Sequence, residues 1–229
     1  MTLNKTSLKP WPPAGVKPYY LDDSVCIIHG DCAGIIPTLG TFDAVVTDPP
    51  YNVGKDYGTH DDRMPDNVYR AWAHLRVGYC VQAAANQFWV APRYKLGMWL
   101  ELLPNAHLIV IPRGASGPLR GGWIDQFEIA LAQGKTLSKH SDLWKGIRLK
   151  GEGYFFTEQT FGHPGYTPTP IMALAISLLA SESVLDPFCG TGGTLRAAKD
   201  QGKRAVGIEI HEPYCEIAAK RMAQEVLAL

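Results

Sequence analysis

The chain has 229 residues, of which 46% are hydrophobic and 10% aromatic, and this composition excludes an intrinsically disordered protein. Its 22 basic and 22 acidic residues cancel, so any binding to nucleic acid has to depend on a local basic patch. The five cysteines include no CxxC pair, which favours a reducing compartment and argues against a disulfide framework or a structural zinc site.

No apolar run approaches membrane-spanning length, and the N-terminus lacks a secretion signal, so we expect a cytoplasmic protein without membrane contact. The charges are unevenly distributed along the chain. Residues 93–150 hold nine Lys or Arg and four Asp or Glu, whereas residues 16–67 hold nine Asp and three basic residues. The first of these segments is the candidate basic patch.

Strand-like and helix-like segments alternate after an aperiodic, proline-containing arm at residues 1–18. The expected strands are residues 25–29, 42–47, 87–91, 106–111, 127–132, 184–187 and 205–209. The expected helices are residues 31–39, 65–84, 93–103, 170–179, 194–201 and 213–227. Residues 135–160 have weak periodicity, and we expect them to be irregular. The alternation predicts βαβ crossovers and a mainly parallel sheet.

The stretch FDAVVTDPPYNVG, residues 42–54, joins an apolar strand directly to Asp48, two prolines and Tyr51. Two prolines fix two φ angles, so the carboxylate and the aromatic ring leave the sheet on a rigid corner. An isolated Asp-Pro at a strand end is often only a turn or a helix cap. As a site, the corner offers a hydrogen-bond acceptor beside an aromatic face.

A second corner lies in SVLDPFCGTGGTLRAAKDQGKRAVGIEI, residues 183–210, which predicts a strand, a glycine turn, a helix and a second strand. Such a turn lets a ligand approach the backbone closely. Glu209 at the tip of the second strand could accept hydrogen bonds from ribose hydroxyls. Close packing of the turn is the simpler alternative for the glycines.

Three segments together resemble one family. The Asp48-Pro49-Pro50-Tyr51 quartet resembles the signature of DNA amino-methyltransferases, and Asp186-Pro187-Phe188 resembles the cofactor corner of S-adenosylmethionine-dependent methyltransferases. The segment GIEIHEPYCEIAAKR resembles the strand and helix that follow that corner. The catalytic corner precedes the cofactor corner, an order similar to that of the circularly permuted β group of adenine-N6 and cytosine-N4 methyltransferases.

The resemblance implies a Rossmann-like α/β fold with a seven-stranded, mainly parallel sheet covered by helices on both faces. It implies one catalytic domain over residues 19–229, with a short target-recognition insert at about 134–161, and S-adenosylmethionine as cofactor. HGDCAGIIPTL resembles the turn that contacts the cofactor's adenine, and GHPGYTPTP resembles the segment around its methionine end, with Thr167 in place of the family's usual lysine. The implied cofactor-binding residues are Asp31, Cys32, His163, Asp186, Pro187, Phe188, Gly190, Gly192, Glu209 and Ile210.

The chemistry of amino methylation explains the first corner. An exocyclic amino group on a base is a poor nucleophile because its lone pair is delocalised, and acceptors that face its hydrogens stabilise the charge that develops on nitrogen. Asp48 would be this acceptor, with Pro49 and Pro50 holding a carbonyl beside it, and Tyr51 would stack on a base flipped out of the duplex. No metal is needed, and the absence of a Pro-Cys pair argues against a cysteine nucleophile.

The expected activity is methylation of adenine N6 in double-stranded DNA, as in restriction-modification systems, with cytosine N4 or RNA as alternatives. The expected DNA-binding residues are Lys55, Arg63, Lys135, Lys139, Lys145, Arg148 and Lys150. The insert is short, which predicts a short target site or a homodimer. The polar loop 52–66 is expected to be mobile and to close over the base. Rival interpretations are a dehydrogenase, an RNA or protein methyltransferase, and a non-catalytic DNA-binding relative.

Overall fold

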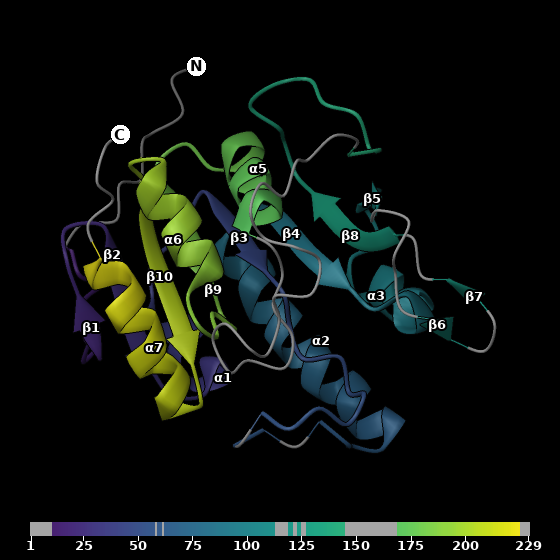
Figure 1. Cartoon of the computed structure of the whole chain (residues 1–229), viewed down its shortest axis with the longest axis horizontal. Helices are drawn as coiled ribbons and strands as arrows, with labels where there is room; N and C mark the ends of the chain where they lie inside the picture. Colours follow the sequence, from purple (N-terminus) through teal and green to yellow (C-terminus); the bar gives the residue numbers. More distant parts are fainter. Residues whose placement is uncertain are drawn as a thin grey trace.

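The computed structural model describes residues 11–57, 59–60, 62–112, 119–120, 123–124, 127–144 and 169–224. Its main element is an eight-stranded sheet with the strand order β1-β2-β10-β9-β3-β4-β8-β5 (Figure 1). The strands are β1 (Tyr20–Leu21), β2 (Val25–His29), β3 (Ala44–Thr47), β4 (Asn86–Ala91), β5 (His107–Pro112), β8 (Phe127–Gln133), β9 (Ser183–Asp186) and β10 (Arg204–Glu209). The predicted mainly parallel α/β sheet is confirmed, with the short β1 as an additional strand.

The five central strands β2, β10, β9, β3 and β4 run parallel, whereas β1, β8 and β5 pair antiparallel with their neighbours. The central strands are buried along almost their whole length, as expected for parallel strands covered on both faces. In the middle of the sheet β9 pairs with β3 in the register Ala44 to Val184. Both predicted corners therefore lie at the carboxyl ends of neighbouring parallel strands, where a parallel α/β fold binds its ligands.

Helices cover the two faces. On one face, α5 (Thr169–Leu179), α6 (Gly193–Asp200) and α7 (Glu212–Ala223) pack against the sheet and form one hydrophobic core. On the other face, α1 (Cys32–Ile35), α2 (Asp66–Ala83) and α3 (Leu96–Leu102) form the second. Figure 1 shows α6 and α7 in front of the sheet and α2 behind it.

The expected elements differ from the observed ones mainly at their ends. The predicted helix 93–103 divides into a 3-10 turn, η2 (Arg93–Lys95), and α3, and the helix after Asp31 divides into α1 and η1 (Ile36–Thr38). The glycine-rich connection before β8 contains two short strands, β6 (Leu119–Arg120) and β7 (Trp123–Ile124), which pair with each other. The last predicted helix is described up to Ala223.

One described residue of the predicted insert, Trp144, belongs to the core. The backbone of Trp144 donates to the carbonyl of Val110 on β5 at 2.9 Å, and its ring stacks on Phe88 at 5.2 Å with an interplanar angle of 7°. Trp144 is 4% exposed. This aromatic residue therefore covers the edge strand of the sheet, and residues 145–161 of the insert lie outside the described residues.

No helix among the described residues is both long and apolar enough to cross a membrane. The same part of the chain contains no group of three or more His, Cys, Asp or Glu arranged to hold a metal ion.

Candidate active site

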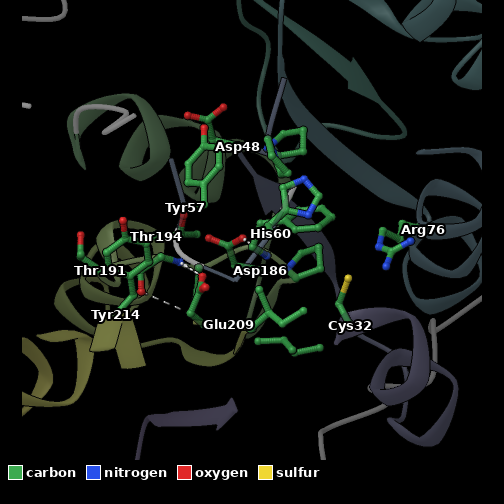
Figure 2. A pocket seen from close by; sticks show the side chains of 18 of the residues that line it. Cys32, Asp48, Tyr57, His60, Arg76, Asp186, Thr191, Thr194, Glu209 and Tyr214 are labelled. Atoms are coloured by element: carbon green, nitrogen blue, oxygen red, sulfur yellow. Dashed lines mark hydrogen bonds between the residues drawn. The ribbon is translucent and has the colours of Figure 1, made fainter. Parts of the chain in front are cut away.

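The two corners predicted from the sequence open into one pocket. The pocket is open to solvent, and its volume is about 1000 Å³ when the solvent in its mouth is included. The predicted residues that line it are Asp31, Cys32, Asp48, Pro49, Pro50, Tyr51, Lys55, Asp186, Pro187, Phe188, Gly190, Glu209 and Ile210. Figure 2 shows Asp186 and Glu209 near the centre and Asp48 at one end of the view.

A hydrogen bond connects the strands that carry the corners. The hydroxyl of Thr47, the last residue of β3, donates to Oδ1 of Asp186, the last residue of β9, at 2.6 Å. Both side chains are buried. Because Asp48 follows Thr47 directly, this bond fixes the start of the first corner relative to the second.

The first corner is held by two tyrosines. The hydroxyl of Tyr51 donates to Oδ1 of Asp48, so the ring and the carboxylate have a fixed relative orientation. Burial raises the pKa of Tyr51 well above its ordinary value, and the negative charge of Asp48 raises it further. The hydroxyl of Tyr69 on α2 donates to the carbonyl of Pro50 at 2.9 Å. The corner is therefore rigid on both sides of Pro50.

The second corner contains a buried acid. Asp186 also accepts a hydrogen bond from the backbone N–H of Phe188 at 3.1 Å. Burial raises its pKa from 3.8 to about 6, although its hydrogen bonds oppose this shift. The acid is 2% exposed, so its ionised form depends on these donors.

The glycine turn serves both the pocket and the packing of the helices. Gly190 lines the pocket, but Gly192 is not among the lining residues. Gly192 has a φ of +83°, and a Cβ at this position would lie 3.1 Å from Cβ of Ala218 on α7. The second glycine is therefore required by backbone conformation and by contact between helices, the simpler of the two explanations considered for the turn.

Glu209 connects the turn with the end of β10. Its two oxygens accept hydrogen bonds from the backbone N–H groups of Gly190 at 2.9 Å and His211 at 2.8 Å. Burial raises the pKa of Glu209 from 4.5 to about 7. A carboxylate has about four acceptor positions, so this one retains capacity for ligand hydroxyls.

Asp31 lies at another side of the pocket and caps α1 by accepting from the N–H of Ala33 at 3.0 Å. Nη2 of Arg76 on α2 contacts both carboxylate oxygens of Asp31 at 2.9 Å. The neighbouring Cys32 is buried, and burial raises the pKa of its thiol to about 12. Cys32 is therefore a neutral wall residue of the pocket.

Several further residues line the pocket besides the predicted ones. They come from the polar loop, from α2, from α6 and its preceding turn, and from α7: Tyr57, His60, Trp72, Arg76, Thr191, Thr194 and Tyr214. The aromatic residues Trp72 and Phe188 lie side by side, with ring centroids 5.5 Å apart. Apart from Trp72 and Arg76, these residues lie in the polar loop or in the two segments for which the sequence shows a resemblance. Only their spacing by four residues on one helix marks Trp72 and Arg76 in the sequence.

The polar loop is organised around Asp62. This buried carboxylate accepts from the backbone N–H groups of Asn52 at 2.6 Å, Val53 at 2.9 Å and Lys55 at 2.9 Å. The loop also reaches the cofactor corner, since the hydroxyl of Thr59 contacts Nδ1 of His211 at 2.9 Å. The predicted mobility and closure of this loop stay predictions.

The predicted DNA-binding residues that the structure describes lie in different places. Lys55 lines the pocket, and Arg63 is exposed on the polar loop. Lys135 donates its backbone N–H to the side chain of Asn86, the first residue of β4, and therefore lies at the edge of the sheet opposite the pocket. Lys139 is exposed. Lys145, Arg148 and Lys150 lie outside the described residues, and so does His163, which was predicted to bind the cofactor.

The pocket fits S-adenosylmethionine in its chemistry. Phe188 offers an aromatic face for an adenine ring, and Glu209 offers acceptor capacity for ribose hydroxyls. The buried acids Asp186 and Glu209 provide sites for negative charge in a pocket that would receive a cationic sulfonium. These side chains are compatible with a ligand that carries an adenine, a ribose and a positive charge.

Comparisons with known proteins agree with this chemistry. Residues 123–220 match the N6/N4 methyltransferase family described as DNA methylase. The chain is 24% identical to the type II methyltransferase M.ScaI of Streptomyces caespitosus, over 93% of this chain and 86% of the relative. It is also 24% identical to the type II methyltransferase M.HpaI of Haemophilus parainfluenzae, over 85% of this chain and 74% of the relative.

Two solved structures share the fold. The complex of M1.HpyAVI with S-adenosylmethionine aligns with a TM-score of 0.63 and 22% identity, covering 87% of this chain and all of the other. The cytosine-N4-specific PvuII DNA methyltransferase aligns with a TM-score of 0.73 and 13% identity, covering 93% and 92%. The family match over residues 123–220, the two relatives and the shared fold make this chain similar to the DNA methyltransferases of the N6/N4 family.

Proposed function

We propose that the chain transfers a methyl group from S-adenosylmethionine to the N6 amino group of an adenine in double-stranded DNA. The observation that carries this proposal is the single pocket that contains both the Asp48 corner and the Asp186 corner. An acceptor for an amino group and a site for the donor have to lie within one cavity if the methyl group is to move directly between them.

Asp48 and Tyr51 would act on the base. Asp48 accepts hydrogen bonds from the amino group and stabilises the positive charge that develops on its nitrogen. The aromatic ring of Tyr51 packs on a base that has left the duplex, an interaction worth about 1–3 kcal/mol per stacked base. The Tyr51 hydroxyl on Asp48 orients the two groups together.

The second corner would hold the donor. S-adenosylmethionine supplies an electrophilic methyl group on its sulfonium. Glu209 accepts from the ribose, Phe188 packs on the adenine, Asp31 accepts from the adenine edge, and Asp186 provides negative charge in the pocket. Cys32, Pro187, Gly190 and Ile210 complete the walls of this part of the pocket.

DNA would contact the protein beside the pocket opening. Lys55 lines the pocket, and the exposed Arg63 is on the same loop. Phosphate contacts from such side chains position a duplex without reading its sequence. A homodimer would add further contacts and compensate for a short recognition insert.

Cytosine N4 is the second candidate for the methylated atom. It is favoured by the likeness of the fold to the cytosine-N4-specific PvuII enzyme. The aspartate of the Asp48 quartet favours adenine, since serine is frequent at this place in the cytosine-N4 enzymes that the sequence resembles. The two amino groups are chemically alike, so only the product distinguishes them.

Mass spectrometry of nucleosides tests the proposal. Unmethylated double-stranded DNA, RNA and protein are each incubated with the chain and S-adenosylmethionine, and the DNA is digested to nucleosides. We expect N6-methyladenine in DNA and none with the Asp48→Ala variant. If N4-methylcytosine is found instead, cytosine N4 is the methylated atom. Methylation of RNA or protein alone would refute the proposal.

A further inference from the structure

One face of helix α2 contacts the first corner, the second corner and Asp31, which together surround the pocket. Tyr69, Trp72 and Arg76 are spaced by three and four residues, so they point to the same side of the helix. At 1.5 Å per residue they extend over about 10 Å of the helix axis. They contact Pro50, Phe188 and Asp31, respectively.

Tyr69 supplies a hydrogen-bond donor that the first corner cannot provide for itself. Pro49 and Pro50 have no backbone N–H groups, so the corner has few donors of its own. The Tyr69 hydroxyl donates to the carbonyl of Pro50 at 2.9 Å, and the side chain is completely buried. This bond fixes the peptide group that leads into Tyr51, whose hydroxyl donates to Asp48.

Trp72 connects the two ends of this face. Its ring is stacked on Tyr69, with centroids 5.6 Å apart and an interplanar angle of 14°. The Trp72 ring also contacts Phe188, with ring centroids 5.5 Å apart. The guanidinium carbon of Arg76 lies 4.5 Å from the centroid of the Trp72 ring. A displacement of Trp72 would therefore be felt at the first corner and at the second.

Arg76 orients the acceptor on α1. Its side chain is only 11% exposed although it is charged, and its guanidinium contacts both oxygens of Asp31 at 2.9 Å. Figure 2 shows Arg76 beside Cys32, on the opposite side of the pocket from Thr191 and Tyr214. The ion pair restricts Asp31 to one orientation and neutralises its charge.

We propose that this face of α2, defined by Tyr69, Trp72 and Arg76, is a positioning surface that aligns the acceptor corner with the donor pocket. Tyr69 acts on the reacting amino group through the Pro50 carbonyl and Asp48. Arg76 acts on the adenine of the donor through Asp31. The inference rests on the proposed function, and it assigns separate effects to the two ends of one helix face.

Tyr69→Phe and Arg76→Ala test the two ends in the full chain. Tyr69→Phe removes one oxygen, and we expect kcat on DNA to fall about tenfold while the Kd for S-adenosylhomocysteine changes less than about twofold. For Arg76→Ala we expect this Kd, measured by calorimetry without DNA, to rise about tenfold, with a smaller change in kcat at saturating donor. Arg76→Lys keeps the charge and should recover most of the affinity.

Two control variants lie on the same helix and contribute no side chain to the pocket. Tyr79→Phe removes an oxygen from a partly buried tyrosine that does not line the pocket, and Arg70→Ala removes an exposed ion pair with Glu101. Both should retain the kcat and the donor affinity of the wild type. A positioning role requires that the test variants differ from these controls and from each other.

The proposal is overturned if Tyr69→Phe and Arg76→Ala lose kcat and affinity in the same proportion, or if both match the controls. If the wild type binds S-adenosylhomocysteine but methylates no DNA, the proposed function fails and the acceptor half of this inference fails with it. The calorimetric comparison of Arg76→Ala with Arg70→Ala then still decides the donor half.

Discussion

Asp48 is the residue on which the proposed transfer depends. It is the side chain at the first corner that can accept from an amino group, and its orientation is fixed by the Tyr51 hydroxyl. For Asp48→Ala we expect turnover to fall by about 10² or more, by analogy with the loss of one preorganised hydrogen bond in other active sites. Donor affinity, measured by calorimetry, should stay near that of the wild type.

The exposed Asp23 provides a control for Asp48 because it carries the same charge outside the pocket. Asp23→Ala should keep full turnover. An Asp48→Ala variant with nearly normal turnover would contradict the proposed role of this carboxylate.

Glu209 should make stability depend on pH. Burial raises its pKa from 4.5 to about 7, so the folded state favours the protonated acid. Its contribution to the free energy of unfolding is therefore complete below about pH 4.5 and is lost as the pH rises through about 7. A shift of this size corresponds to about 3 kcal/mol.

Urea unfolding of the cofactor-free protein between pH 4.5 and 8 measures this effect. We expect Glu209→Gln to lose less stability than the wild type as the pH rises. Glu216 is exposed and paired with Lys220, so Glu216→Gln should retain the wild-type slope in this range. Equal slopes for the wild type and Glu209→Gln would show that Glu209 does not titrate in this way.

At the scale of elements, the contact between α6 and β10 depends on a glycine. A Cβ on Gly207 of β10 would lie 2.6 Å from Cδ1 of Leu195 and 2.8 Å from Sγ of Cys189. For Gly207→Ala we expect a loss of about 1–3 kcal/mol in the free energy of unfolding, typical of overpacking. Thermal and urea unfolding measure it.

Gly78 on α2 is the matched control, because nothing lies within 4 Å of a Cβ at this position. Gly78→Ala should increase stability by about 0.5–1 kcal/mol, since alanine is the better helix former. If the two variants had the same effect, the contact at Gly207 would not be the cause.

The polar loop after the first corner should depend on Asp62. Three backbone N–H groups donate to its buried carboxylate. Without the carboxylate, these three hydrogen bonds are lost and the loop is less stable. We expect Asp62→Ala to increase the rate of proteolytic cleavage within residues 52–66, while Asp23→Ala leaves it unchanged. Cleavage at the wild-type rate would show that the loop is held by other contacts.

The pattern of the sequence predicted most elements of the fold because buried parallel strands read as apolar runs. It also predicted the two corners, since prolines and glycines at strand ends have few structural alternatives. It did not reveal Tyr69 or Arg76, because each acts through a contact with a residue 19 or 45 positions away. Trp144 was counted with the recognition insert, and only its stacking on Phe88 shows that it belongs to the core.

At the scale of the molecule, the strand order explains why two distant segments make one site. β9 comes late in the chain and β3 early, yet they are neighbours at the centre of the sheet. The crossover connections then leave on opposite sides of this pair, and the ends of β9 and β3 form the crevice between them. The order of motifs along the chain is thus compatible with one pocket, whichever corner comes first.

The two buried acids Asp186 and Glu209 should make the exchange of S-adenosylhomocysteine for S-adenosylmethionine depend on pH. With pKa values of about 6 and about 7, part of this pair carries protons near neutrality. A cationic donor favours their ionised forms, so its arrival should expel protons into the buffer, and calorimetry in buffers of different ionisation enthalpy would count them. S-adenosylhomocysteine lacks the sulfonium charge, so its binding should release fewer protons. A higher pH should therefore increase the affinity for S-adenosylmethionine relative to that for S-adenosylhomocysteine.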